Sequence, residues 1–262
     1  MNDAGELDEG TIHSKWLELA PLIDRMMERV GTEDEFPVAS HSSLALDSAA
    51  TNPYHLSHAL RMCLTAAVDH LHALKVLVVD AGVLHVAAPS SLSRGALENL
   101  AAAYWILGPE DRTDRVERLL QWYAKNFKDG ETATAGINIP DRTSLDDKLE
   151  KLYAVGAHRS IDPRKIRNGY TSTDAVTYAE QNAPNLPLGV VLPWRLCSGF
   201  AHGRPWAYLG SLHREEVDRG NDIRNVKLTS DLGRTLYPVL ASVQLLERFL
   251  RLYSARAETG LA

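Results

Sequence analysis

The segment from Leu97 to Leu107 constrains the fold of this 262-residue chain more than any other. Its apolar side chains, including an unbroken run from Ala101 to Leu107, cover almost every face of a helix. A helix that is apolar all round has no face to offer to water, so it belongs in the middle of a bundle. We expect this helix to begin near Pro89 and to end before Pro109.

Apolar residues at steps of three and four predict further helices on both sides of this segment. The first is expected over residues 12–31 with Gly31 as the C-cap, and the next from Pro53 to about Asp80. Three more are expected over 112–128, from Ser144 to Val155 with Ser144 and Asp147 as a capping-box variant, and over 174–181. The last two are expected over 194–203 with Pro193 in the first turn, and from Thr229-Ser230-Asp231 to about Arg256, where Pro238 should kink the helix or delay its start.

The connections between these helices are expected to be loops. They cover residues 32–51, 129–142 and most of 156–187, while alternation over 212–228 around Gly220-Asn221-Asp222 predicts a small β-hairpin. Because no βαβ alternation occurs, the predicted fold is all-α: an up-and-down helical bundle with irregular insertions and one small β-hairpin. We divide it into an N-terminal arm of helix and loop, residues 1–51, and a helical bundle, residues 52–258.

Composition constrains the partners and the cellular compartment that we expect for the protein. The net charge of −6 argues against bulk electrostatic adhesion to nucleic acid or anionic lipid. Cys63 and Cys197 are the only cysteines, which supports neither a disulfide framework nor a thiolate metal cage and favours a reducing compartment. The N-terminus has no signal-peptide pattern, and no apolar run approaches the roughly 20 residues of a membrane span. We therefore expect a cytoplasmic protein without membrane association.

Several kinds of chemistry have no motif in this chain. A Gly-rich phosphate loop, a dinucleotide fingerprint, a His-Glu-x-x-His site and a nucleophile elbow are all absent from the sequence. His70 and His72 fall on different faces of one helix, and no carboxylate joins His55 and His58 at helical spacing. We predict neither a metal nor a cofactor.

Arg195 and His202 form the first polar constellation. Seven steps along a helix return them to within about 20° of one face, roughly 10 Å apart along its axis. Two such groups suit successive points of an extended phosphate ligand, or a symmetric copy across a dimer. Ser198 lies on a nearby face, Gly199 allows a close approach, and Arg204 adds a second cation. The alternative is that both side chains are satisfied by carbonyls near a helix end.

The sequence contains three further constellations of polar residues. Arg94 and Glu98 form an i,i+4 pair on the central apolar helix, either as a structural ion pair or with Glu98 orienting His202 or Arg195. Asp69 belongs to a polar stripe that is either a solvated face or the edge of a cleft. A basic segment is the candidate for contacting phosphate, or else an ordinary solvated loop; its proposed phosphate-binding residues are Arg159, Arg164, Lys165 and Arg167.

The Arg-x6-His pattern in an all-helical chain resembles the HEPN superfamily of small helical-bundle proteins. The segments 91–107 and 198–203 also look like an uncharacterised bacterial branch of such proteins, and the resemblance covers roughly residues 55–255. The resemblance implies one of two functions for this chain. The first is a metal-independent ribonuclease or toxin whose Arg and His lie at a dimer interface, and the second is an inactive binding module. Carried over, Arg195 would stabilise the charge of the phosphorane and His202 would shuttle the proton.

Three functional hypotheses result. The first is a metal-independent endoribonuclease of defence or toxin type, acting as a homodimer on RNA and controlled by an antitoxin partner. The second is a non-catalytic helical module that binds a nucleotide, another phosphate ligand or a partner protein, which Leu196 and the net acidity favour. The third is an enzyme of another class, in which Arg94, Glu98 and Asp69 converge in one cleft.

Overall fold

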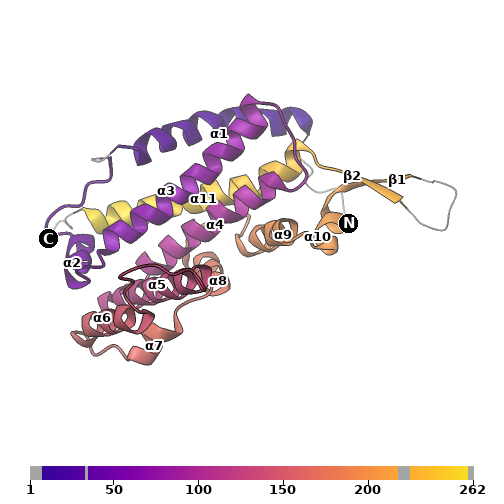
Figure 1. The fold of residues 1–262 in the computed structure, drawn as a ribbon. Helices are drawn as coiled ribbons and strands as arrows, with labels where there is room; N and C mark the ends of the chain where they lie inside the picture. Colours follow the sequence, from indigo (N-terminus) through magenta and orange to yellow (C-terminus); the bar gives the residue numbers. More distant parts are fainter. Residues whose placement is uncertain (1–7, 33–34, 218–224, 259–262) are drawn as a thin grey trace. The chain divides into compact units, whose positions relative to one another are not determined.

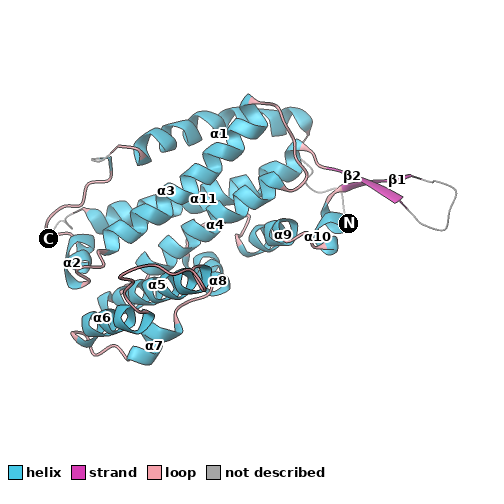
Figure 2. Ribbon diagram, in the orientation of Figure 1, coloured by secondary structure: helices cyan, strands magenta, loops and turns pink. Residues whose placement is uncertain are grey.

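The fold is all-α, as predicted, with one small antiparallel hairpin. The computed structural model describes residues 8–32, 35–217 and 225–258, and within them strands occur only in that hairpin (Figure 1, Figure 2). The central helix α4, Ala88–Leu107, matches its predicted start and end. Every side chain from Leu100 to Leu107 is buried, which confirms that this half of the helix has no face toward water.

The chain divides into two compact units, and each unit draws segments from both sides of residue 51. One unit combines residues up to 35 with 64–100 and 183–248, and the other combines 36–63, 101–182 and the residues from 249 onward. Three helices contribute residues to both units: α3 (Leu56–Lys75), α4 and α11 (Leu232–Ala257).

The first unit carries the N-terminal helix and the hairpin. Its further elements are α1 (Glu9–Val30), η2, a π-helical turn (Val76–Asp80), α9 (Val191–Ala201), α10 (Pro205–Ser211), β1 (His213–Val217) and β2 (Asn225–Thr229). The two strands pair with Val217 opposite Asn225, and their connecting turn lies outside the described residues.

A buried lysine attaches α1 to the end of α3 in this unit. Lys75 Nζ lies 2.7 Å from Asp24 Oδ1 and 2.9 Å from Asp80 Oδ2, and its side chain is 8% exposed. Hydrogen bonds to these two carboxylates raise the pKa of Lys75 above its usual value. The charge is thus compensated on both sides, as a buried cation requires.

The second unit is built around α5. Its elements are α2 (Ser43–Ala50), α5 (Arg112–Ala133), α6 (Leu145–Ala157), α7 (Pro163–Asn168) and α8 (Ser172–Asn182). Helices α5, α6 and α7 enclose one apolar cluster, in which Gly156 allows close contact because a Cβ there would lie 2.7 Å from Ile166 Cδ1.

Asp47 and Arg115 form the buried polar centre of the second unit. The Asp47 side chain has no exposed surface, and it accepts from Arg115 Nε at 2.5 Å, from Arg115 Nη2 at 3.1 Å and from Arg112 Nε at 2.9 Å. Arg115 also donates to the carbonyls of Pro109 and Glu110, at 2.8 and 2.7 Å. Its guanidinium therefore ties α2, the α4–α5 turn and α5 together.

Several predicted boundaries were wrong, and side-chain caps explain the two helices that were missed. The predicted loop over 32–51 contains α2, because the hydroxyl of Ser42 caps its N-terminus and Leu44 enters the core. Pro53 lies in a turn, and α3 starts only at Leu56. The expected irregular stretch 156–187 contains α7, capped by the side chain of Asp162.

Other predicted ends were displaced by a few residues. Helix α5 continues to Ala133, inside the expected connector 129–142, and α9 begins at Val191. A further helix, α10, starts at Pro205 where none was predicted. The caps at Ser144 and Gly31 and the ends of α1 and α11 agree with the prediction to within a few residues.

The helical stretch Leu56–Asp80 has the length and composition of a membrane span, with a mean hydropathy of 1.5 in its most apolar window. Core helices of globular proteins pass the same test, and 44% of that window is buried inside this protein.

Replacing Asp47 with Ala should lower the free energy of unfolding by about 3–5 kcal/mol, because it leaves the buried Arg115 guanidinium without its counter-charge. Urea denaturation followed by circular dichroism measures this loss. Asp129→Ala is the matched control. It breaks an ion pair between Asp129, 62% exposed, and Lys125, 42% exposed, and it should lower the free energy of unfolding by less than about 1 kcal/mol. Equal losses in both variants would contradict the assigned role of Asp47.

Candidate functional site

Helix α9 presents Arg195 and His202 to solvent. Both residues are exposed, and within the described part of the chain neither side chain forms a hydrogen bond or an ion pair. Arg195 lies in the middle of the helix, and His202 is its C-cap residue, with φ −101° and ψ 10°. The alternative that nearby carbonyls satisfy both side chains therefore does not describe this helix end.

The corner after His202 has the geometry that its sequence dictates. Gly203 adopts a left-handed φ of +62°, its N–H donates to the Phe200 carbonyl at 3.1 Å, and the Arg204 N–H donates to the Gly199 carbonyl at 2.8 Å. This is the Schellman arrangement that ends a helix at a glycine. Pro205 then occupies the first turn of α10, where a missing N–H costs nothing.

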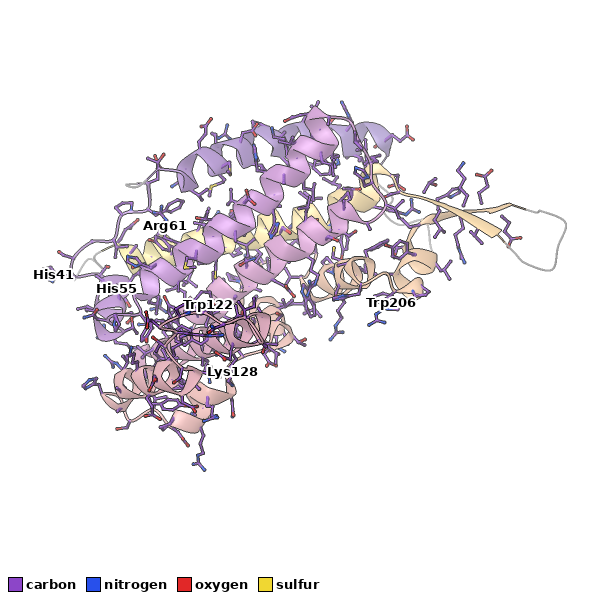
Figure 3. All side chains as sticks on the ribbon, viewed as in Figure 1. His41, His55, Arg61, Trp122, Lys128 and Trp206 are labelled. Atoms are coloured by element: carbon purple, nitrogen blue, oxygen red, sulfur yellow. The ribbon has the colours of Figure 1, made fainter. Side chains whose placement is uncertain are left out.

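Trp206 packs onto α9 between Arg195 and His202. Gly199 follows Arg195 by four residues and precedes His202 by three, so all three lie on one stripe of the helix. A Cβ at Gly199 would lie 2.6 Å from Ala207 Cβ and 2.7 Å from Trp206 Cζ2. The predicted close approach thus exists, and side chains of α10 make it. The indole stays 55% exposed. Figure 3 labels Trp206 on α10.

This corner is basic and partly apolar at its surface. From residue 191 to residue 211 the sequence contains Arg195, Arg204 and His202 but no acidic residue, although the whole chain has a net charge of −6. Leu192 and Leu209 are exposed beside them. Cations next to an exposed indole offer contacts to phosphate and to the face of a base. Sequence reasoning missed Trp206, although Pro205 as a helix start would have placed it at the second position of a new helix.

Glu98 reaches α9 but contacts neither Arg195 nor His202. Its Oε1 atom accepts from Arg94 Nη2 at 2.8 Å, the predicted i,i+4 pair, and from Trp194 Nε1 at 3.0 Å. This carboxylate therefore holds α9 against α4 through the residue next to Arg195. Ser198 is half-buried, and its carbonyl accepts from the His202 N–H at 3.1 Å.

Asp69 is exposed on α3, where the described residues give it no hydrogen bond or ion pair. The adjacent His70 packs instead on α4, since a Cβ at Gly95 would lie 2.4 Å from His70 Nε2. Glu98 is engaged elsewhere, and the structure gives no support to a cleft shared by Asp69, Glu98 and Arg94.

The basic segment predicted to bind phosphate belongs to the second compact unit. Arg164 pairs with Asp162 at 2.8 Å and Lys165 with Glu117 at 3.2 Å, so acidic neighbours offset two of its four cations. The side chains of Arg159 and Arg167 have no ion pair among the described residues. Lys128 donates a hydrogen bond to the Arg167 carbonyl. Burial together with nearby cations lowers the pKa of Lys128.

The face of α9 opposite Arg195 lines a cavity of about 800 Å³. Leu196, Cys197 and Phe200 form its α9 wall, and residues of α1, α4, α10 and α11 complete it. Burial raises the pKa of Cys197 to about 12, so this thiol stays protonated and uncharged near neutral pH. Among the described residues no group of three or more His, Cys, Asp or Glu side chains is arranged to hold a metal ion.

No protein-family model, no curated protein and no solved structure matches this chain.

Replacing Gly199 with Ala should destabilise the protein by about 1–3 kcal/mol, because Ala207 Cβ is fixed to the α10 backbone and α10 must move. A thermal melt measures the change. Gly210→Ala is the matched control on α10, where nothing lies within 4 Å of the added Cβ, and it should leave the melting temperature equal or slightly higher. The assigned contact is wrong if both variants melt alike.

Proposed function

We propose that the protein is a metal-independent endoribonuclease that uses Arg195 and His202 in a homodimer. The observation that carries this proposal is the exposed stripe of α9, where both side chains are unpartnered among the described residues and Trp206 lies between them. A cation, an imidazole and an indole on one surface supply contacts for the phosphate, the proton and the base of an RNA strand.

The proposed reaction needs only these groups and the substrate. The 2′-hydroxyl attacks the adjacent phosphorus, the bond from phosphorus to the 5′-oxygen breaks, and the products are a 2′,3′-cyclic phosphate and a 5′-hydroxyl. His202 accepts the proton of the 2′-hydroxyl and supplies one to the leaving oxygen, a role that imidazole performs near neutral pH. Arg195 stabilises the negative charge that develops on the phosphorane oxygens.

The separation of the two groups supports a dimeric site. Seven residues of helix place Arg195 and His202 roughly 10 Å apart along the axis, too far for a direct hydrogen bond. A phosphate between them, or a second copy facing the stripe, closes that distance. The exposed side chains of Leu192, Trp206 and Leu209 supply apolar surface for such a contact.

A second candidate function is a non-catalytic module that binds a nucleotide or another phosphate ligand on the same stripe. The position of Glu98 favours it, because this carboxylate is bonded to Arg94 and Trp194 and does not orient the His202 imidazole. Nucleotide-dependent thermal stabilisation without cleavage would support this candidate, with a gain of about 2.7 kcal/mol at a ligand concentration 100-fold above Kd.

The ribonuclease proposal predicts that the purified protein cleaves RNA in the presence of EDTA. His202→Ala should reduce the rate by about 100-fold or more, because the general acid–base group is lost. The melting temperature should not change, since His202 is exposed. His13→Ala, at another exposed histidine, is the control and should cleave at the full rate. Undiminished cleavage by His202→Ala would refute the assignment.

Mixing two inactive variants tests the dimeric site. If Arg195 of one copy acts with His202 of the other, Arg195→Ala mixed with His202→Ala should recover about a quarter of the activity, since half of the dimers are mixed and one of their two sites is intact. The rate of RNA cleavage after subunit exchange measures this recovery. No recovery would mean that both groups act within one chain.

A further inference from the structure

The cavity behind α9 is separate from the exposed stripe of Arg195 and His202. Leu196, Cys197 and Phe200 follow Arg195 by one, two and five residues, which turns them about 100–200° away from it. Its volume of about 800 Å³ lies within the range of small-molecule sites. A ligand site in this cavity is therefore independent of the proposed ribonuclease site.

The lining of this cavity carries no unpaired formal charge among the described residues. Asp231 and Arg234 are its only Asp, Glu, Lys or Arg side chains, and they form an ion pair with each other. Arg234 Nε also donates to the Ser211 carbonyl, and Arg234 N–H donates to Asp231 Oδ1 at 2.8 Å. An ion entering the cavity would thus lose its hydration without gaining a free counter-charge.

Three of the five hydroxyl groups in the lining have hydrogen-bond partners within the protein. Thr235 Oγ1 donates to the Asp231 carbonyl at 3.0 Å, and the Tyr237 hydroxyl donates to the Leu188 carbonyl at 3.2 Å. The Ser90 hydroxyl is hydrogen-bonded to the Cys197 side chain. These three hydroxyl groups are therefore already engaged within the protein.

Residues of the lining also carry potential hydrogen-bond acceptors. Pro238 lies inside α11 and has no N–H, so the carbonyl of Arg234, four residues earlier, lacks its usual helical donor. Arg234 and Pro238 both line the cavity. His85 also lines it, is exposed, and in its neutral form keeps one ring nitrogen as an acceptor. A ligand that donates a hydrogen bond fits this wall.

Apolar side chains make up the rest of the wall. Ile12, Val86, Leu188, Leu196, Phe200 and Leu236 come from different elements and meet in this one space. We propose that the cavity binds an uncharged, mostly apolar small molecule that carries a hydrogen-bond donor. Removal of its apolar surface from water provides the affinity, and a hydrogen bond to one of these acceptors orients it.

A fluorescent probe of this chemistry tests the proposal. N-phenyl-1-naphthylamine is uncharged, apolar and carries one N–H donor, and its emission rises in apolar surroundings. Titrated into the full-length protein, it should bind saturably, with one molecule per chain. Its derivative 1-anilinonaphthalene-8-sulfonate differs by one sulfonate and should bind about tenfold more weakly, because the lining offers no free cation.

Substitutions inside and outside the cavity locate the binding. Leu196→Trp fills the cavity and should weaken probe binding about tenfold or more, whereas Leu192→Trp, at a position 59% exposed, should leave it unchanged. Leu240→Trp fills the cavity from α11 and repeats the test if Leu196→Trp does not fold. Circular dichroism melts confirm that each variant is folded.

The outcomes are decisive in both directions. Saturable binding that both cavity-filling variants weaken and Leu192→Trp does not supports the proposal. Absence of saturable binding, equal affinity in all folded variants, or tighter binding of the sulfonated probe would overturn it. None of these results bears on the proposed RNA cleavage, which would use the exposed side chains of Arg195 and His202.

Discussion

The burial of the second half of α4, residues 100–107, is the constraint on which the rest of the structure depends. From Leu100 to Leu107 no side chain of this helix reaches solvent, so other elements must cover it on every side. The helix contributes residues to both compact units, as do α3 and α11. Its two charged side chains, Arg94 and Glu98, lie in the preceding turns and compensate each other at 2.8 Å.

Helix α9 carries two chemically different surfaces because successive side chains are turned by about 100°. Arg195 and His202 share its exposed stripe with Gly199, onto which Trp206 packs. Leu196, Cys197 and Phe200 face the cavity on the other side. Trp194 of this helix donates a hydrogen bond to Glu98 of α4, which links both surfaces to the central helix. A ligand in the cavity would contact the same helix that presents the proposed catalytic pair.

Buried charges mark the places where helices of each unit are joined. Lys75 lies between two carboxylates in one unit, and Arg115 between Asp47 and two backbone carbonyls in the other. In both cases the burial of a charge is tolerated because several hydrogen bonds replace its hydration. None of these partnerships was predicted, because the sequence does not reveal that Lys75, Asp47 and Arg115 are buried.

The sequence by itself determined the all-α class, the burial of α4, the hairpin and most helix ends. These features depend on local signals: apolar periodicity, the caps at Ser144 and Gly31, and the proline and glycine positions. It also placed Arg195 and His202 on one face, since that requires only the helical repeat.

Only the tertiary structure decided what surrounds these elements. It brought Trp206 onto Gly199, bonded Glu98 to Trp194 across 96 residues, joined Arg115 to Asp47 across 68, and assembled the cavity from five helices and their connections. Periodicity tells which side of a helix is buried, but it carries no information about which distant segment covers that side. That choice follows from how all the helices pack together, and it is there that the partners of the functional side chains are selected.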